Sequence, residues 1–268
     1  MLSSLSSLSS LSSLSRLAAV VVVAVVTTMA CTPKTPPTVE QPVDKPMPGL
    51  TAIRIAPRTP TPADEQPPLL ILMHGVGSNE RDLTSLAPQL DPRLLIYSVR
   101  APNVLGTDRF GWFALRVAAD GTRTIDAKQA EASRLAVLRF IDDVVARDNV
   151  DPARVYVGGF SQGGIMAMSL ALTAPEKLAG AIDMSGRILD EVKSITASDD
   201  RLSGLPVLVV HGTDDATLGI EHGRASRALL EAHPVVLTYR ELPMGHTITP
   251  ASLAVVSTWL TTQLDSPT

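Results

Sequence analysis

The sequence contains little cysteine, few aromatic residues and no long apolar run. Cys31 is the single cysteine among 268 residues, which excludes an internal disulfide framework and a cysteine-rich zinc site. Aromatic residues make up 3% of the chain and the formal net charge is −4, whereas nucleic-acid binding needs a basic surface and usually stacking rings. No apolar stretch reaches the length of about 18 residues that a membrane-spanning helix requires. With 45% apolar and 19% charged residues, the composition predicts a globular domain.

The N-terminal region differs in composition from the rest of the chain. Residues 2–15 repeat Leu-Ser-Ser, and the cation Arg16 precedes the apolar run Leu17–Val26. A cation, a short apolar run and small residues before a cleavage point are typical of a secretory signal peptide. We therefore predict that the protein is exported.

Cys31 narrows the type of signal. The segment Thr28–Cys31 resembles the lipobox of bacterial lipoproteins, in which the cysteine is acylated and becomes the new N-terminus; an incidental or buried cysteine is the alternative. Prolines are frequent directly after it and predict an extended spacer. The sequence thus predicts a lipoprotein-type signal peptide over residues 1–30, lipidation at Cys31, a proline-rich tether over 31–48 and a folded domain over 49–268. The protein would be membrane-anchored in a bacterial cell envelope.

Short apolar runs alternate with helical patterns in this domain. The run Leu69–Met73 is continuously apolar and ends at His74-Gly75, as expected of a buried parallel strand. Further strands are expected at Leu94–Val99, Arg154–Val157, Gly180–Met184, Leu205–Val210 and Val235–Leu242. Helices are expected at Ala127–Ala146, Gln162–Leu172, Gly219–Ala232 and Pro250–Leu264. The apolar stripe of the first helix is expected to include Leu135.

Strands that alternate with helices predict an α/β fold with a mostly parallel, doubly wound sheet flanked by helices. Ligands bind such sheets at the carboxyl ends of the strands. The polar residues that directly follow each apolar run are therefore the candidates for a functional site.

A glycine-rich turn follows the strand predicted at Arg154–Val157. It contains the motif Gly-x-Ser-x-Gly from Gly159 to Gly163, with Ser161 at its centre. This motif is typical of a nucleophile elbow, a strained strand-to-helix turn in which larger side chains at the glycine positions would collide. The preceding apolar strand and the following helical run favour the elbow over an ordinary glycine-rich turn. Ser161 is therefore the candidate nucleophile.

A serine nucleophile needs a base, and the ordinary pKa of histidine, about 6.5, suits proton exchange near neutral pH. Among the histidines, His246 lies C-terminal to Ser161, between the last predicted strand and the last predicted helix, as the order Ser, acid, His requires. The acid should follow the strand Leu205–Val210, where Asp214 and Asp215 stand side by side. The residues themselves leave open which aspartate it is.

An oxyanion hole completes such a site. It takes one N–H group from the residue after the serine, here Gln162, and a second from the loop after an earlier strand. That loop is His74–Asn79, whose glycines let the backbone approach a substrate. Aligned N–H groups there would stabilise developing negative charge.

Together these motifs resemble the phospholipase/carboxylesterase family of α/β-hydrolases, the acyl-protein thioesterase-like esterases. The resemblance rests on an ordered set of segments: Leu72–Glu80, Arg100–Pro102, Gly111–Phe113, Asp151–Val155, Gly159–Gly164, His211–Asp215 and Met244–His246. It implies an α/β-hydrolase fold, with Ser161 as nucleophile, Asp215 as acid and His246 as base. It also implies Val76 and Gln162 as the oxyanion donors.

We therefore expect a serine hydrolase that cleaves carboxylic esters or thioesters through an acyl-enzyme on Ser161. The substrate would be a small or lipid-like acyl ester, and the resemblance implies that Trp112 and Phe113 lie near its acyl group, with ordinary core packing as the alternative. No cofactor or metal is implied, because no histidine pair has ligand spacing and no phosphate-binding loop with lysine occurs. Two other hypotheses are a membrane-tethered, non-catalytic binding protein on a hydrolase fold and an esterase of polymeric or feruloylated substrates.

Overall fold

The computed structural model describes residues 49–62, 64–117 and 123–266. The predicted signal peptide over residues 1–30, the predicted lipidation site Cys31 and the tether over residues 31–48 lie outside these ranges. Within them, no helix combines the length and the apolar character needed to cross a membrane.

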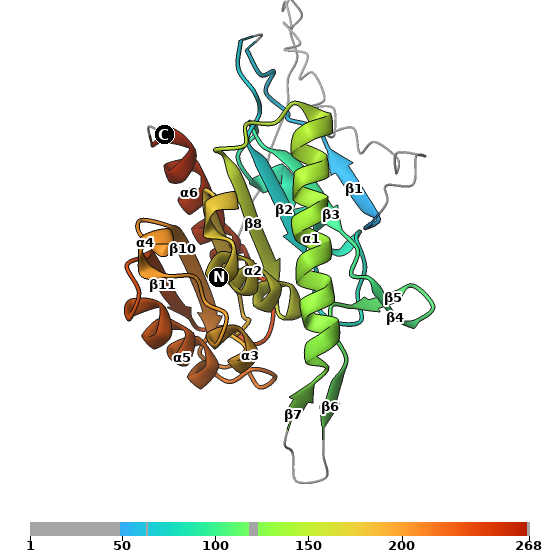
Figure 1. Cartoon of the computed structure of the whole chain (residues 1–268), viewed down its shortest axis with the longest axis vertical. Helices are drawn as coiled ribbons and strands as arrows, with labels where there is room; N and C mark the ends of the chain where they lie inside the picture. Colours follow the sequence, from blue (N-terminus) through green and yellow to red (C-terminus); the bar gives the residue numbers. More distant parts are fainter. Residues whose placement is uncertain (1–48, 63, 118–122, 267–268) are drawn as a thin grey trace, which may run out of the picture. The chain divides into compact units, whose positions relative to one another are not determined.

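A seven-stranded sheet forms the centre of the domain, with the strand order β1-β3-β2-β8-β9-β10-β11 (Figure 1). Its strands are β1 (Ala52–Ile55), β2 (Leu69–Met73), β3 (Leu95–Val99), β8 (Val155–Phe160), β9 (Gly180–Met184), β10 (Pro206–Gly212) and β11 (Val236–Leu242). All neighbours pair in parallel except β1, which runs antiparallel to β3. The predicted strands are confirmed. The edge strand β1 was not predicted, because its four residues include an arginine and form no apolar run.

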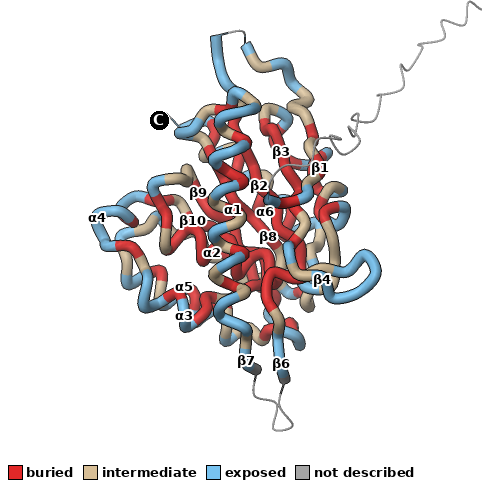
Figure 2. The backbone as a smooth tube through the Cα atoms, turned by 45° about the vertical axis from the view of Figure 1, so that its right-hand side comes forward, coloured by how far each residue is buried: buried red, intermediate tan, exposed pale blue. Residues whose placement is uncertain are grey.

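Helices cover both faces of the sheet. They are α1 (Ala127–Asp148), α2 (Gln162–Thr173), α3 (Asp190–Lys193), α4 (Asp199–Leu202), α5 (Ile220–Glu231), α6 (Pro250–Asp265) and the 3-10 helices η1 (Asp82–Gln89) and η2 (Pro175–Lys177). Leu69, Ile71 and Met73 of β2 pack in the same cluster as α1 and α2, whereas Leu70 and Leu72 pack with η1 and α6. The central strands are therefore buried on both sides (Figure 2).

Helix α1 buries a different stripe from the one predicted. Leu135 is 39% exposed, whereas Val137, Phe140 and Val144 are buried against the sheet. The prediction for Leu135 was wrong because the spacing of apolar residues did not establish which side of the helix faces the core. Leu135 and Val137 lie about 200° apart around the helix axis, so only one of them can face inward.

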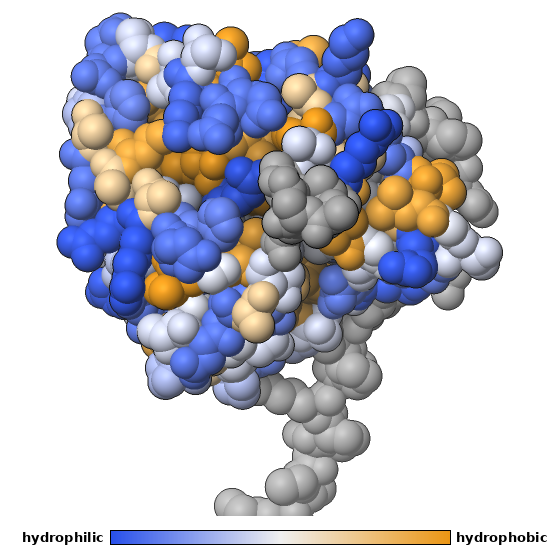
Figure 3. All heavy atoms as spheres, turned by 90° about the horizontal axis from the view of Figure 1, so that it is seen from below, coloured by the Kyte–Doolittle hydropathy of each residue, from blue (hydrophilic) through white to orange (hydrophobic). Residues whose placement is uncertain are grey.

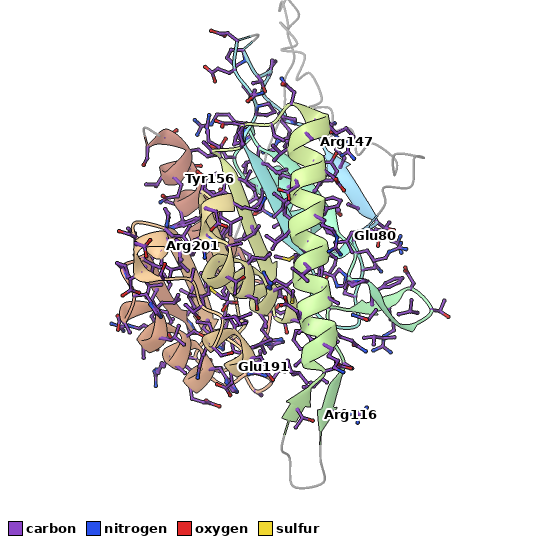
Figure 4. The ribbon with its side chains drawn as sticks, viewed as in Figure 1. Glu80, Arg116, Arg147, Tyr156, Glu191 and Arg201 are labelled. Atoms are coloured by element: carbon purple, nitrogen blue, oxygen red, sulfur yellow. The ribbon has the colours of Figure 1, made fainter. Side chains whose placement is uncertain are left out.

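Two hairpins extend from the sheet. They consist of β4 (Asn103–Gly106) with β5 (Arg109–Gly111), and β6 (Leu115–Val117) with β7 (Arg123–Ile125). The first docks on the loop after β2, because Gly77 N–H donates to Phe110 O over 2.7 Å. Glu80 lies above this hairpin in Figure 4 and accepts two hydrogen bonds from Arg100, of 2.5 and 2.6 Å. Burial acts to raise the pKa of Glu80, but the hydrogen bonds that the carboxylate accepts and the charges of Arg100 and Arg81 together hold that pKa below its usual value.

Candidate active site

Ser161 occupies a tight turn between β8 and α2. Its φ of 55° and ψ of −117° lie outside the regions that L-residues favour, a strain that costs on the order of 1–3 kcal/mol. The flanking glycines make the turn possible. A Cβ on Gly163 would lie 1.8 Å from Met73 O, and a Cβ on Gly159 would lie 2.3 Å from the carbonyl carbon of Gly163. The predicted nucleophile elbow is therefore present in the structure.

The structure brings His246 between Ser161 and Asp215. His246 Nε2 is 2.8 Å from Ser161 Oγ, and His246 Nδ1 is 2.7 Å from Asp215 Oδ2. The carboxylate can only accept, so Nδ1–H donates to Asp215 and Nε2 is left to accept the Ser161 hydroxyl. The ring of His246 also packs against Phe160, with 4.8 Å between ring centroids and a tilt of 43° between the rings. The imidazole is thus oriented to take the serine proton.

Asp215, and not Asp214, makes this contact. The side chain of Asp215 is fully buried, and its Oδ1 accepts hydrogen bonds from Thr217 N at 2.9 Å and from Leu218 N at 2.8 Å. Burial acts to raise the pKa of Asp215, but these bonds and the one from His246 prevail, so the pKa lies below its usual value. Asp214 is exposed. Asp215 therefore stays ionised beside the imidazole at neutral pH.

The candidate oxyanion donors lie beside the serine. A Cβ on Gly75 would be 3.5 Å from Ser161 Cβ, so the loop after β2 passes directly over the nucleophile. Within the described residues, neither Val76 N–H nor Gln162 N–H donates a hydrogen bond to another group. Unpaired N–H donors next to a nucleophile are what an oxyanion hole requires.

Trp112 and Phe113 are buried close to this site. Trp112 has no exposed surface and Phe113 is 2% exposed. The Trp112 indole donates to His74 O over 2.9 Å, so Trp112 supports the loop that carries Val76. Contact of these two rings with a substrate stays a prediction.

The buried histidines have structural partners. His74 Nε2 accepts Ala101 N–H over 3.0 Å, so Nδ1–H donates to Gly75 O, and burial lowers the pKa of His74. His211 Nε2 lies 2.7 Å from Leu218 O, on the same loop that holds the acid. Both rings therefore support loops of the site. Over the described part of the chain, no group of three or more His, Cys, Asp or Glu residues is placed to hold a metal ion.

The site opens at the carboxyl ends of the parallel strands, as the fold class predicts. Figure 3 views the molecule from below in the orientation of Figure 1, towards this end of β2 and β8. Apolar residues gather there in a hollow that polar residues border. An apolar hollow at this end of the sheet suits an apolar substrate group.

The fold and this arrangement define an α/β-hydrolase. The chain belongs to the phospholipase/carboxylesterase family, whose model matches residues 56–264. It is 27% identical over 232 residues to acyl-protein thioesterase 1 of Gibberella zeae, a match that covers 79% of this chain and 97% of that protein. The match to this family and to an acyl-protein thioesterase shows that the chain is a hydrolase of esters or thioesters.

Solved structures of relatives share the fold. The carboxylesterase of Mesorhizobium loti superposes with a TM-score of 0.67 at 25% identity, covering 79% of this chain and 94% of that one. The carboxylesterase of Bacillus cereus superposes with a TM-score of 0.68 at 24% identity, covering 80% of this chain and 94% of that one. The predicted family and fold are therefore confirmed.

The sequence did not reveal one feature of the site. The side chain of Gln162 is buried and its amide is bonded at both ends, to Trp112 N and to Phe113 O. The elbow motif drew attention to the backbone N–H of this residue and not to its side chain. A long polar side chain inside an otherwise apolar helix start was the available signal.

Proposed function

We propose that the protein hydrolyses carboxylic esters or thioesters through an acyl-enzyme on Ser161. The observation that carries this proposal is the continuous hydrogen-bond chain from Ser161 through His246 to Asp215, with separations of 2.8 and 2.7 Å. Nucleophile, base and orienting acid at these distances form the arrangement that activates a serine.

The first half of the reaction forms the acyl-enzyme. His246 Nε2 takes the hydroxyl proton as Ser161 Oγ attacks the carbonyl carbon, and the carbonyl electron pair moves onto its oxygen. The N–H groups of Val76 and Gln162 hold that oxyanion. Collapse of the intermediate breaks the bond to the alcohol or thiol, which leaves with the proton from His246. Asp215 stabilises the imidazolium while it carries the proton.

The second half releases the acid. Water attacks the acyl carbon and gives its proton to His246, and a second oxyanion forms in the same place. Its collapse returns the proton to Ser161 Oγ and frees the carboxylic acid. Water is the one co-reactant that the cycle needs.

Labelling with a fluorophosphonate probe tests this mechanism. The wild-type protein should label, Ser161→Ala should not, and the exposed-serine control Ser203→Ala should label like wild type. Hydrolysis of p-nitrophenyl acyl esters should fall by at least about 10⁴-fold in Ser161→Ala. A folded wild-type protein that neither labels nor hydrolyses esters would instead favour the non-catalytic binding protein. Rates on thioester and polymeric esters, compared with the p-nitrophenyl series, define the substrate class.

We also propose that the protein is exported and anchored by a lipid on Cys31. The apolar run Leu17–Val26 after Arg16, and the small residue Ala30 directly before Cys31, support this. Mass spectrometry of the mature N-terminus should show an acylated Cys31, and globomycin should block its maturation. The variant Cys31→Ser should leave the membrane fraction. A mature protein with a free thiol at Cys31 would contradict the proposal.

A further inference from the structure

The segment Gly111–Ala114, which comprises the last residue of β5 and the loop to β6, lies against the residues of both candidate oxyanion donors. A Cβ on Gly111 would be 3.4 Å from Gln162 Oε1 and 3.5 Å from Val76 Cγ2. The donor residues belong to different parts of the fold, one in the loop after β2 and one at the start of α2. This segment is therefore in contact with both halves of the proposed oxyanion hole.

The Gln162 amide binds the backbone of this segment with both of its ends. Its Oε1 accepts Trp112 N–H over 2.7 Å, and its Nε2 donates to Phe113 O over 2.8 Å. Gln162 is 4% exposed, so water cannot replace these partners readily. The side-chain amide of Gln162 has an oxygen that accepts and an NH₂ group that donates. It can therefore pair at once with the N–H group of Trp112 and the carbonyl of Phe113, the next residue.

The same segment is held from its other side. Ser133 Oγ on α1 and Asn103 Nδ2 on β4 both donate to Trp112 O, over 2.5 and 2.9 Å. Ala114 N–H donates to Gln129 Oε1 on α1 over 2.8 Å. Side chains of α1 and β4 thus fix the position of the segment independently of Gln162, which makes it a rigid support for the Gln162 amide.

The indole of Trp112 completes a path to the second donor. Its Nε1 donates over 2.9 Å to His74 O, two residues before Val76. His74 is itself fixed, because its Nε2 accepts Ala101 N–H over 3.0 Å. A continuous set of hydrogen bonds therefore runs from the Gln162 side chain through Trp112 to the loop that carries Val76.

We propose that the side chain of Gln162 is a positioning residue that sets, through the segment Gly111–Ala114, the spacing of the two N–H donors of the oxyanion hole. This inference rests on the proposed function, because the donors matter only if an oxyanion forms between them. Donors must lie within a few tenths of an ångström of their ideal distance to stabilise the transition state. One donor lies in the loop after β2 and the other at the start of α2, so a segment that contacts both residues can set their spacing.

The variant Gln162→Met tests the inference because it keeps the backbone N–H and the side-chain volume while it removes both amide bonds. We expect kcat for p-nitrophenyl esters to fall by about 10- to 100-fold, less than the loss of a whole oxyanion donor, with KM within about three-fold of wild type. Binding of a trifluoromethyl ketone, which forms an oxyanion adduct on the serine, should weaken by the same factor as kcat/KM. General structural damage would also change KM, whereas misplaced oxyanion donors weaken only the binding of the transition state and its analogue.

The variant Gln162→Glu adds a pH-dependent readout. The introduced carboxyl can donate to Phe113 O only when it is protonated, and its carboxylate would repel that carbonyl. The activity of this variant relative to wild type at the same pH should therefore rise as the pH is lowered. If the side chain does not position the donors, the ratio should stay constant at every pH at which the variant remains fully folded.

Trp112→Phe provides an independent variant, since it keeps an aromatic ring but breaks the bond to His74. It should show the same fall in kcat at nearly constant KM. The control Ser169→Ala lies on the same helix and removes a bond to Ile165 O within that helix, and its activity should stay within about two-fold of wild type. If Gln162→Met does not fold, the outcomes for Gln162→Glu and Trp112→Phe decide.

Several results would overturn the inference while the proposed function stands. They are a kcat of Gln162→Met within about two-fold of wild type, a loss confined to KM, or an equal loss in Ser169→Ala. A pH-independent activity ratio for Gln162→Glu would have the same effect. Failure of the wild-type protein to label or to hydrolyse esters overturns the proposed function and this inference together.

Discussion

Replacement of Asp183 by asparagine is expected to stabilise the protein at neutral and alkaline pH. Asp183 is the penultimate residue of β9 and has no exposed surface, and its Oδ1 accepts Gly186 N–H over 2.8 Å. Its Oδ2 has no hydrogen-bond partner within the described residues. A Cβ on Gly164 would lie 2.2 Å from Oδ1, so helix α2 closes the space around the carboxyl group. Burial therefore raises the pKa of Asp183 to about 7.

The size of the effect follows from this pKa. An aspartate in the unfolded chain titrates near 3.8, so the pKa rises on folding by roughly three units, and each unit corresponds to about 1.4 kcal/mol. From pH 4 to pH 7 the unfolded state binds fewer protons than the native state, so the free energy of unfolding falls as the pH rises. The loss is complete above pH 7 and amounts to something on the order of 4 kcal/mol. Asparagine does not titrate, so the variant does not lose this stability as the pH rises.

Urea denaturation of wild type and Asp183→Asn between pH 4 and pH 8 measures this difference. The variant should gain stability relative to wild type by about 1.4 kcal/mol per pH unit up to pH 7, with a constant difference above that. The pH dependence is the informative quantity, because the new amide also has one unpaired group. Asp143→Asn, an exposed position on α1, should show a difference that hardly changes with pH. A constant difference for Asp183→Asn over the whole range would refute the reasoning.

Three further substitutions have clear expectations. Asp215→Asn should lower kcat on p-nitrophenyl esters by about 10⁴-fold, because the imidazole loses its orienting charge, while Asp214→Asn should change kcat by no more than about three-fold. Gly163→Ala should destabilise the protein by more than about 3 kcal/mol in thermal melting, because its Cβ would lie 1.8 Å from Met73 O. Asp91→Asn should cost on the order of 1–2 kcal/mol at pH 7, because hydrogen bonds from a neighbouring arginine lower the pKa of Asp91 to about 2. Urea titration should show that this cost shrinks as the pH falls from about 4 towards 2.

Each of these predictions has an outcome that contradicts it. Equal activity losses in Asp214→Asn and Asp215→Asn would mean that the observed contact with His246 does not orient the base. Gly106→Ala is the control for the glycine variant, since no atom lies within 4 Å of its Cβ position, and an equal loss of stability there would remove the steric explanation. A cost for Asp91→Asn that does not depend on pH would show that its charge is not what stabilises the fold.

Much of the fold was predictable because its signals are local. A buried parallel strand must be apolar on both faces, so Leu69–Met73 could be recognised from its own residues. The strand β1 and the two hairpins lacked such a signal, since their residues alternate or are mostly exposed. The error at Leu135 has the same origin: the periodicity of α1 predicted a helix, but its contacts with the sheet decide which residues are buried.

The amino-acid sequence by itself predicted the elbow at Ser161, because the glycine motif and the strand and helix that flank it are consecutive in the chain. The residues alone left Asp214 and Asp215 open, and the family resemblance implied Asp215. The tertiary structure brings Asp215 to His246, and it alone showed that the Gln162 amide bonds to Trp112 and Phe113. Those contacts join residues 31 to 50 positions apart, and Ser161 and His246 are separated by 85. Distances of that kind depend on how strands order and pack in the sheet, and no local pattern of residues specifies them.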